Sequence, residues 1–113
     1  MSAIDKAKAH YKEVLSAGLQ GPIRVPEWDS EIYYKPSANF SQQAQVIELH
    51  QAGKSVEALV MTLILRALDS EGKALFSKAN KAELMKSVDP DVIVRIVDEI
   101  NNHEVDVDEA LGN

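Results

Sequence analysis

One segment, residues 56–68, constrains the fold more than any other part of the sequence, because it is apolar around most of its circumference. On a helical wheel at about 100° per residue, its apolar side chains cover roughly 260°. Only Thr62 and Arg66 form a polar strip, and Glu57 stands alone in the first turn. A helix with so little polar surface either lies at the centre of a domain or is shared with another chain.

These two interpretations of residues 56–68 stay open at the level of sequence. If the apolar surface exceeds what one small domain can bury, the excess becomes an oligomer interface. We then expect three side chains near the contact between copies, namely Leu59, Met61 and Leu63.

The N-terminal segment has the spacing of an amphipathic helix that lies against another element. Ser2 can cap it, with Asp5 three residues later as the capping-box partner. Gly18 and Gly21 end it. Its apolar residues recur at helical spacing and form a stripe roughly 100° wide. They are Ile4, Ala7, Tyr11, Val14, Leu15 and Leu19.

Proline punctuates residues 22–36 and predicts a short β-hairpin. Apolar and polar residues alternate on both sides of a turn at Asp29-Ser30, and Pro26 restricts the first strand to an edge. Trp28 lies close to Tyr33 and Tyr34 along this hairpin. Either these aromatic side chains cover the helical core, or they anchor a binding partner.

Three more helices are predicted in the remainder of the chain. The first has Ser37, Asn39 or Ser41 as its cap and stops near Gly53. It carries Phe40, Ala44 and Ile47 on one face. Ser55 is the expected cap of the apolar helix that follows.

After an acidic turn at residues 69–72, Ser77 or Asn80 starts a small helix that contains Ala82, Leu84 and Met85. The last helix has a strong start signal, because Asp89 caps it and Pro90 takes the first helical position. Its β-branched residues fall on one face, which favours a helix over a strand. They are Val92, Ile93, Ile96, Val97 and Ile100.

Together these patterns predict a mainly α fold, a small helical domain with an N-terminal amphipathic helix and one short β-hairpin. We expect a single domain over residues 1–102, and a mobile acidic tail over residues 103–113. The 113 residues fit one domain of ordinary size.

Composition excludes several classes of function. The net charge is -6, and the twelve Lys and Arg residues are scattered rather than clustered. We therefore expect no binding to nucleic acid and none to a membrane surface. The sequence has no cysteine, which agrees with a reducing cytoplasm. The N-terminus lacks the apolar stretch of a signal peptide.

No combination of residues suggests catalysis, a metal or a cofactor. The three histidines, His10, His50 and His103, are far apart and match no metal-ligand spacing. Asp106 and Asp108 match the start of a calcium loop, but the chain then departs from that pattern. We expect a protein that is not an enzyme, and that works by binding other proteins.

The order of segments over roughly residues 22–113 forms a recognisable pattern. It starts with Val-Pro-Glu-Trp-Asp at 25–29 and Ile-Tyr-Tyr-Lys-Pro at 32–36. It continues with the apolar helix, acidic-Gly turn and Leu-Phe over 63–76, and with a last helix that ends in Ile-Asn-Asn at 100–102. This order resembles the tail assembly chaperones of long-tailed (siphovirus-type) phages. After that helix, Asn-Asn-His-Glu-Val replaces the more apolar exit of the family.

The resemblance implies a function without chemistry. Such proteins coat the aggregation-prone tape measure protein in the host bacterial cytoplasm and hold it for polymerisation of the tail tube protein. They self-associate and are absent from the mature virion. A frameshifted longer form recruits the tube protein, and residues 111–113 permit a slippery codon sequence at the end of the gene. The alternatives are another phage structural or adaptor protein, or a small helical regulatory protein.

Overall fold

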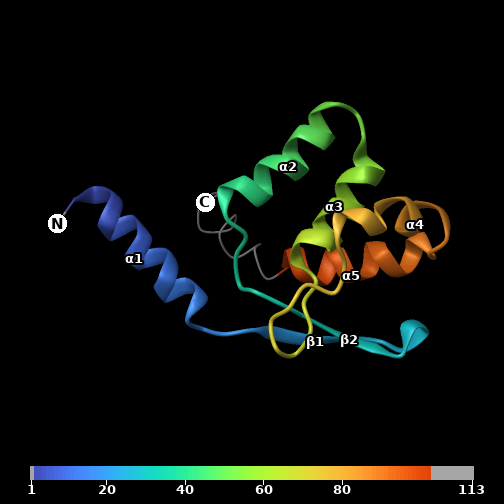
Figure 1. The fold of residues 1–113 in the computed structure, drawn as a ribbon, viewed down its shortest axis with the longest axis horizontal. Coiled ribbons are helices and arrows are strands. Elements are labelled where there is room, and N and C mark those ends of the chain that lie inside the picture. The colour runs from blue at the N-terminus through green and yellow to red at the C-terminus, as the bar shows by residue number, and fades with distance from the viewer. Residues whose placement is uncertain (1, 103–113) are drawn as a thin grey trace.

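The computed structural model describes residues 2–102 and confirms a mainly α fold with one two-stranded hairpin. In Figure 1 the hairpin runs along one side of a group of helices, and the first helix stands apart from them. The elements are α1 (Ala3–Leu15), β1 (Gln20–Val25), the 3₁₀ turn η1 (Pro26–Trp28), β2 (Ser30–Tyr34), α2 (Phe40–Gln51), α3 (Ser55–Arg66), the 3₁₀ turn η2 (Lys78–Asn80), α4 (Lys81–Lys86) and α5 (Pro90–Asn102). The predicted acidic tail lies outside the described residues.

Helix α3 is the centre of the fold, and it packs against α2, α4 and α5. The two residues of its polar strip are also buried, and each has a hydrogen-bond partner. The hydroxyl of Thr62 donates to the Ala58 carbonyl at 3.0 Å, and Nη2 of Arg66 donates to the Lys35 carbonyl at 2.8 Å. Burial of these polar groups is therefore tolerated, because their donors are satisfied inside the chain.

Both predicted ends of α3 need correction. The helix starts at Ser55 itself, and the cap position is Lys54 rather than Ser55. It ends at Arg66, not at residue 68, because the chain turns into an extended conformation at Ala67. Leu68 then pairs with Tyr33 through two backbone hydrogen bonds of 2.8 Å and also bridges to Ala74. A pairing between distant segments thus overrides the local helical preference.

Helix α5 forms as predicted. A carboxylate oxygen of Asp89 accepts the Asp91 N–H at 3.0 Å, and Pro90 is the first helical residue. Its predicted apolar face is entirely buried against α3 and β1. That face consists of Val92, Ile93, Ile96, Val97 and Ile100. The β-branched run is helical because the cap starts the helix and the core covers its apolar face.

The hairpin confirms the predicted alternation. Its strands are antiparallel, with Ile23 opposite Ile32, and its inward side chains join the core. They are Ile23, Val25, Ile32 and Tyr34. Pro26 ends the first strand by starting η1, and Asp29 closes the turn in a left-handed conformation with φ 47°. Gly21 lies so close to the opposite strand that an added Cβ would be 2.9 Å from the Ile32 carbonyl oxygen.

The connection between α3 and α5 consists of short capped segments. The carboxylate of Asp69 accepts the N–H groups of Glu71 at 2.8 Å and Lys73 at 3.0 Å, which fixes the predicted acidic turn. Ser77 and Asn80 form the cap of η2, and α4 follows it directly. Of the small predicted apolar face of α4, only Leu84 is buried.

Helices α1 and α2 are peripheral, and neither contains a buried residue. Ser2 caps α1 by accepting the Asp5 N–H at 3.3 Å, although the reciprocal half of the predicted capping box is absent. Asn39 caps α2 and forms a complete capping box with Gln42. Among residues 2–102, no helix is both long enough and apolar enough to cross a membrane.

Candidate interaction surface

The described residues offer no group of histidine and carboxylate side chains that could hold a metal ion. The titratable groups with displaced pKa values all have structural explanations. Hydrogen bonds from the Lys73 and Glu71 N–H groups, foremost that of Lys73, lower the pKa of Asp69. Burial raises the pKa of the Tyr34 hydroxyl, and the neighbouring Glu99 carboxylate raises it further. The causes of these shifts lie in the turn at Asp69 and in the packing around Tyr34.

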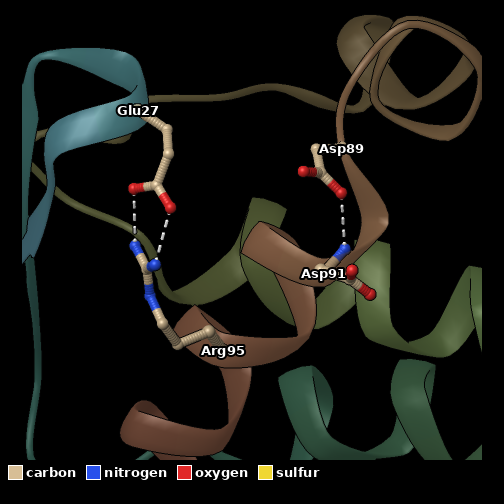
Figure 2. A network of polar contacts seen from close by, with 4 residues as sticks. All are labelled: Glu27, Asp89, Asp91 and Arg95. Atoms are coloured by element: carbon tan, nitrogen blue, oxygen red, sulfur yellow. Dashed lines mark hydrogen bonds and ion pairs between the residues drawn. The ribbon is translucent and has the colours of Figure 1, made fainter.

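The strongest polar contact joins the hairpin turn to α5 (Figure 2). The Arg95 guanidinium donates to both carboxylate oxygens of Glu27, at 2.7 and 3.0 Å. This pair lowers the pKa of Glu27 to about 2, chiefly through the hydrogen bond from Arg95. Figure 2 also shows the Asp89 carboxylate beside the Asp91 N–H. The carboxylates of Glu27 and Asp89 are therefore both hydrogen-bonded to groups of the same chain.

Among the aromatic residues of the hairpin, Trp28 is half-buried and Tyr34 is buried in the core. The rings of Trp28 and Phe76 meet edge to face, with centroids 6.1 Å apart and an interplanar angle of 79°. Tyr33 is half-buried, and its backbone pairs with Leu68. The placement of Trp28 and Tyr34 favours the core-covering interpretation, while a role for any of the three in partner binding stays a prediction.

The three predicted interface residues of α3 all face the interior of the chain to some degree. Leu63 is completely buried, Met61 is buried, and Leu59 is half-buried against the core. Helix α3 therefore lies at the centre of the domain, which is one of the two interpretations that the sequence left open. Participation of these side chains in an oligomer contact stays a prediction, and Leu63 exposes no surface with which to make it in this conformation.

The two most exposed of the large apolar side chains, Phe40 and Ile4, belong instead to the peripheral helices, although Val56 in the first turn of α3 is also 62% exposed. Phe40 is 87% exposed and Ile47 48%, and together with the exposed Ala44 they form a row along α2 that we call the α2 stripe. On α1, Ile4 is 65% exposed and Ala7 is also exposed. The sequence identified both rows as apolar helix faces, and predicted for the α1 row that it lies against another element, without naming that element.

A groove adjoins the α2 stripe, between α2, the end of α3 and the end of α5. Its lining is mostly apolar or uncharged, and Ile47 contributes to both the stripe and the groove. A second hollow on the other side of the α2 N-terminus contains Tyr11 of α1 and Phe40. The lining residues of the groove are Ala38, Gln42, Gln43, Val46, Ile47, Thr62, Leu65, Arg66 and Asn101.

This surface is suited to binding another apolar surface. Apolar side chains exposed in a row at helical spacing offer a contact for another apolar helix. The signal for it was present in the sequence, because Phe40, Ala44 and Ile47 share a face. What periodicity could not reveal is that no element within residues 2–102 covers that face.

Comparison with solved structures finds a similar fold, whereas comparison with sequences finds no match. No protein-family model matches the sequence, and no curated protein matches it. Among solved structures, the chain is similar to the tail assembly chaperone of bacteriophage HK97, with a TM-score of 0.62 and 16% sequence identity. The similarity covers 86% of this chain and 96% of that one. The chain is therefore similar in fold to a phage tail assembly chaperone, as the resemblance in its sequence predicted.

Proposed function

We propose that this protein is a phage tail assembly chaperone that binds apolar helical segments of a tape measure protein. The observation that carries the proposal is the open α2 stripe beside its groove, on a fold similar to that of such a chaperone. A bound helix would place its apolar side chains between Phe40 and Ile47 and extend into the groove. This is the helix-in-groove mode of recognition.

The energy of such binding comes from burial of apolar surface. Covering one large apolar side chain contributes about 1.5–3 kcal/mol, so a row of contacts suffices for association without charged anchors. The net charge of -6 suits a chaperone function, because acidic complexes with an apolar client repel one another and so stay dispersed.

The remaining parts of the proposal follow from the same function. The protein acts without catalysis, works in the host bacterial cytoplasm as a homo-oligomer, and is left out of the mature virion. A longer, frameshifted form contacts the tail tube protein. Mass spectrometry of purified virions tests the absence of the chain from the finished particle, and sequencing of the gene's last codons tests the frameshift.

Co-expression with the proposed client, a tape measure protein from the same genome, tests the client interaction. We expect the wild-type chain to keep that protein soluble and to co-purify with it. Phe40→Ser should remove most of this effect, because it takes away the most exposed apolar side chain of the α2 stripe. Val94→Ser is the matched control, because Val94 is an exposed apolar residue on α5, at 39% exposure, outside the stripe.

The proposal fails if the client remains insoluble with the wild-type chain. It also fails in its choice of surface if Val94→Ser weakens co-purification as much as Phe40→Ser does. Circular dichroism of both variants ensures that each is compared in the folded state.

A further inference from the structure

Helix α1 has an apolar stripe whose first half is not covered by any of the other described residues. Only its last turns touch the rest of the protein, where Tyr11, Val14 and Leu15 are half-buried. The first two turns carry Ile4 and Ala7 on the same stripe, and both residues are exposed. Figure 1 shows this half of α1 pointing away from the other helices.

The exit from α1 is structured and fixes this direction. The N–H groups of Ser16 and Gly18 donate back to carbonyl oxygens of the last helical turns, at 2.9 Å to Lys12 and 3.1 Å to Leu15. On the stripe itself, the Tyr11 hydroxyl donates to the Ser37 carbonyl at 3.5 Å. With both contacts in place, the first two turns of α1 lie away from α2 of the same chain.

The exposed stripes of α1 and α2 match in length and in pattern. Helix α1 has 13 residues and α2 has 12, so both are about 18–20 Å long. On α1 the order is large, small, large, with Ala7 between Ile4 and Tyr11. On α2 it is the same, with Ala44 between Phe40 and Ile47. Small residues between large ones let two helices approach closely and interdigitate.

The charges of the two helices also fit. Residues 2–16, which contain α1, carry three lysines against two carboxylates, whereas residues 17–102 carry nine Lys and Arg against twelve Asp and Glu. Helix α2 has no Lys or Arg and one carboxylate, Glu48. A slightly basic helix is therefore attracted to the acidic remainder of another copy rather than repelled by it.

From these observations we infer that the α1 stripe of one copy packs on the α2 stripe of a second copy. The exposed residues Ile4 and Ala7 of one row and the exposed residues of the α2 stripe then cover each other. The inference deepens the proposed function, because it assigns a resident occupant to the surface that the client is proposed to use. A client helix must displace α1 of the neighbouring copy, so free chaperone does not expose its binding surface.

The absence of cysteine from the sequence allows a direct test on the purified chain alone. Two single-cysteine variants, Ala7→Cys and Ala44→Cys, are mixed in equal amounts, one of them with a size tag, and oxidised mildly. A disulfide requires Cβ atoms about 3.5–4.5 Å apart, so it reports close approach. We expect a mixed disulfide between tagged and untagged chains. Ser87→Cys replaces Ala44→Cys as the control, since Ser87 is exposed at the far end of α4.

A further pair of variants tests the contact itself. In the Ala7→Cys chain, Ile4→Asp should reduce the yield of mixed disulfide at least fivefold, because it places a carboxylate on the stripe. His10→Asp adds the same charge to the polar face of α1 and should leave the yield unchanged.

The inference is overturned by an equal yield with Ser87→Cys, or by equal effects of Ile4→Asp and His10→Asp. It is also overturned if one chain with both Ala7→Cys and Ala44→Cys closes its disulfide within a monomer at high dilution. Because no client is present, its failure leaves the co-expression result untouched, and the reverse also holds.

Discussion

Helices α1 and α5 are alike in sequence and opposite in environment. Each has 13 residues, each starts after a polar side-chain cap, and each carries an apolar stripe on one face. In α5 five residues of the stripe are buried, whereas α1 has no buried residue. An amphipathic pattern therefore predicts a helix and its apolar face, but it does not say whether the same chain covers that face.

The difference divides the molecule into a core and a rim. One cluster of buried side chains joins the hairpin, α3, α4 and α5. The rim consists of α1 and α2, whose apolar rows are left for contacts outside the chain. Isolated helices of this length are marginal in water, so α1 depends on contacts beyond its own hydrogen bonds. This dependence agrees with packing of α1 on a second copy.

A matched pair of isoleucines gives the largest test of the contrast. Ile96 on α5 is fully buried, and Ile4 on α1 is 65% exposed. Ile96→Ala should lower the free energy of unfolding by about 4 kcal/mol, because it leaves a cavity in the core. Ile4→Ala should change that free energy by less than about 0.5 kcal/mol in a dilute, unassociated sample. Urea denaturation measures both values, and similar losses would erase the distinction between core and rim.

The second prediction concerns the single tryptophan, which lies at the boundary between hairpin and core. Trp28→Ala should lower the free energy of unfolding by about 2 kcal/mol, less than for a fully buried aromatic side chain, because Trp28 is only half-buried on Phe76. The wild-type emission should be blue-shifted relative to free tryptophan. Unchanged stability together with weaker client binding would instead show that Trp28 belongs to the binding surface and not to the core.

The core was the part of the fold that the sequence could predict. The start of α5 at Asp89-Pro90, the alternation in the hairpin and the start of a small helical segment at Ser77 all depend on residues close together in the chain. The end of α3 could not be predicted in this way. It depends on Leu68 pairing with Tyr33, a residue 35 positions away, and local propensity carries no information about such a pairing.

The candidate site was predictable only in part, and for a related reason. Periodicity correctly placed Phe40 and Ile47 on one face of α2. It could not show that Leu63 is buried, and so it left Leu63 as a candidate for an oligomer contact. Which of these faces is covered depends on how many other apolar faces the fold supplies. Here α4 and α5 pack on α3, β1 packs on α5, and among residues 2–102 no further element remains to cover α2 on its outer side.

The smallest expected effect concerns the outer face of α5, where Arg95 holds Glu27. Because this bond lowers the pKa of Glu27 to about 2 from an ordinary value of 4.5, the folded state keeps its carboxylate charged where the unfolded chain takes up a proton. The stabilisation is therefore complete above pH 4.5 and is lost as the pH falls toward 2. The pair is about 40% exposed, so solvent and salt reduce its contribution.

Thermal melts of the wild type and of Glu27→Gln, recorded between pH 6 and pH 2 at low salt, measure this contribution. The melting temperature of the wild type should exceed that of the variant by a small margin at pH 6, and the two should converge near pH 2. Glu13→Gln is the charge-matched control, because it removes a carboxylate from the exposed part of α1. If Glu13→Gln produces the same pH-dependent difference, the effect comes from net charge, and the ion pair does not distinguish α5 from α1. A difference confined to Glu27→Gln means that α5 is held on both its apolar and its charged faces, while α1, within the described part of the chain, buries none of its residues.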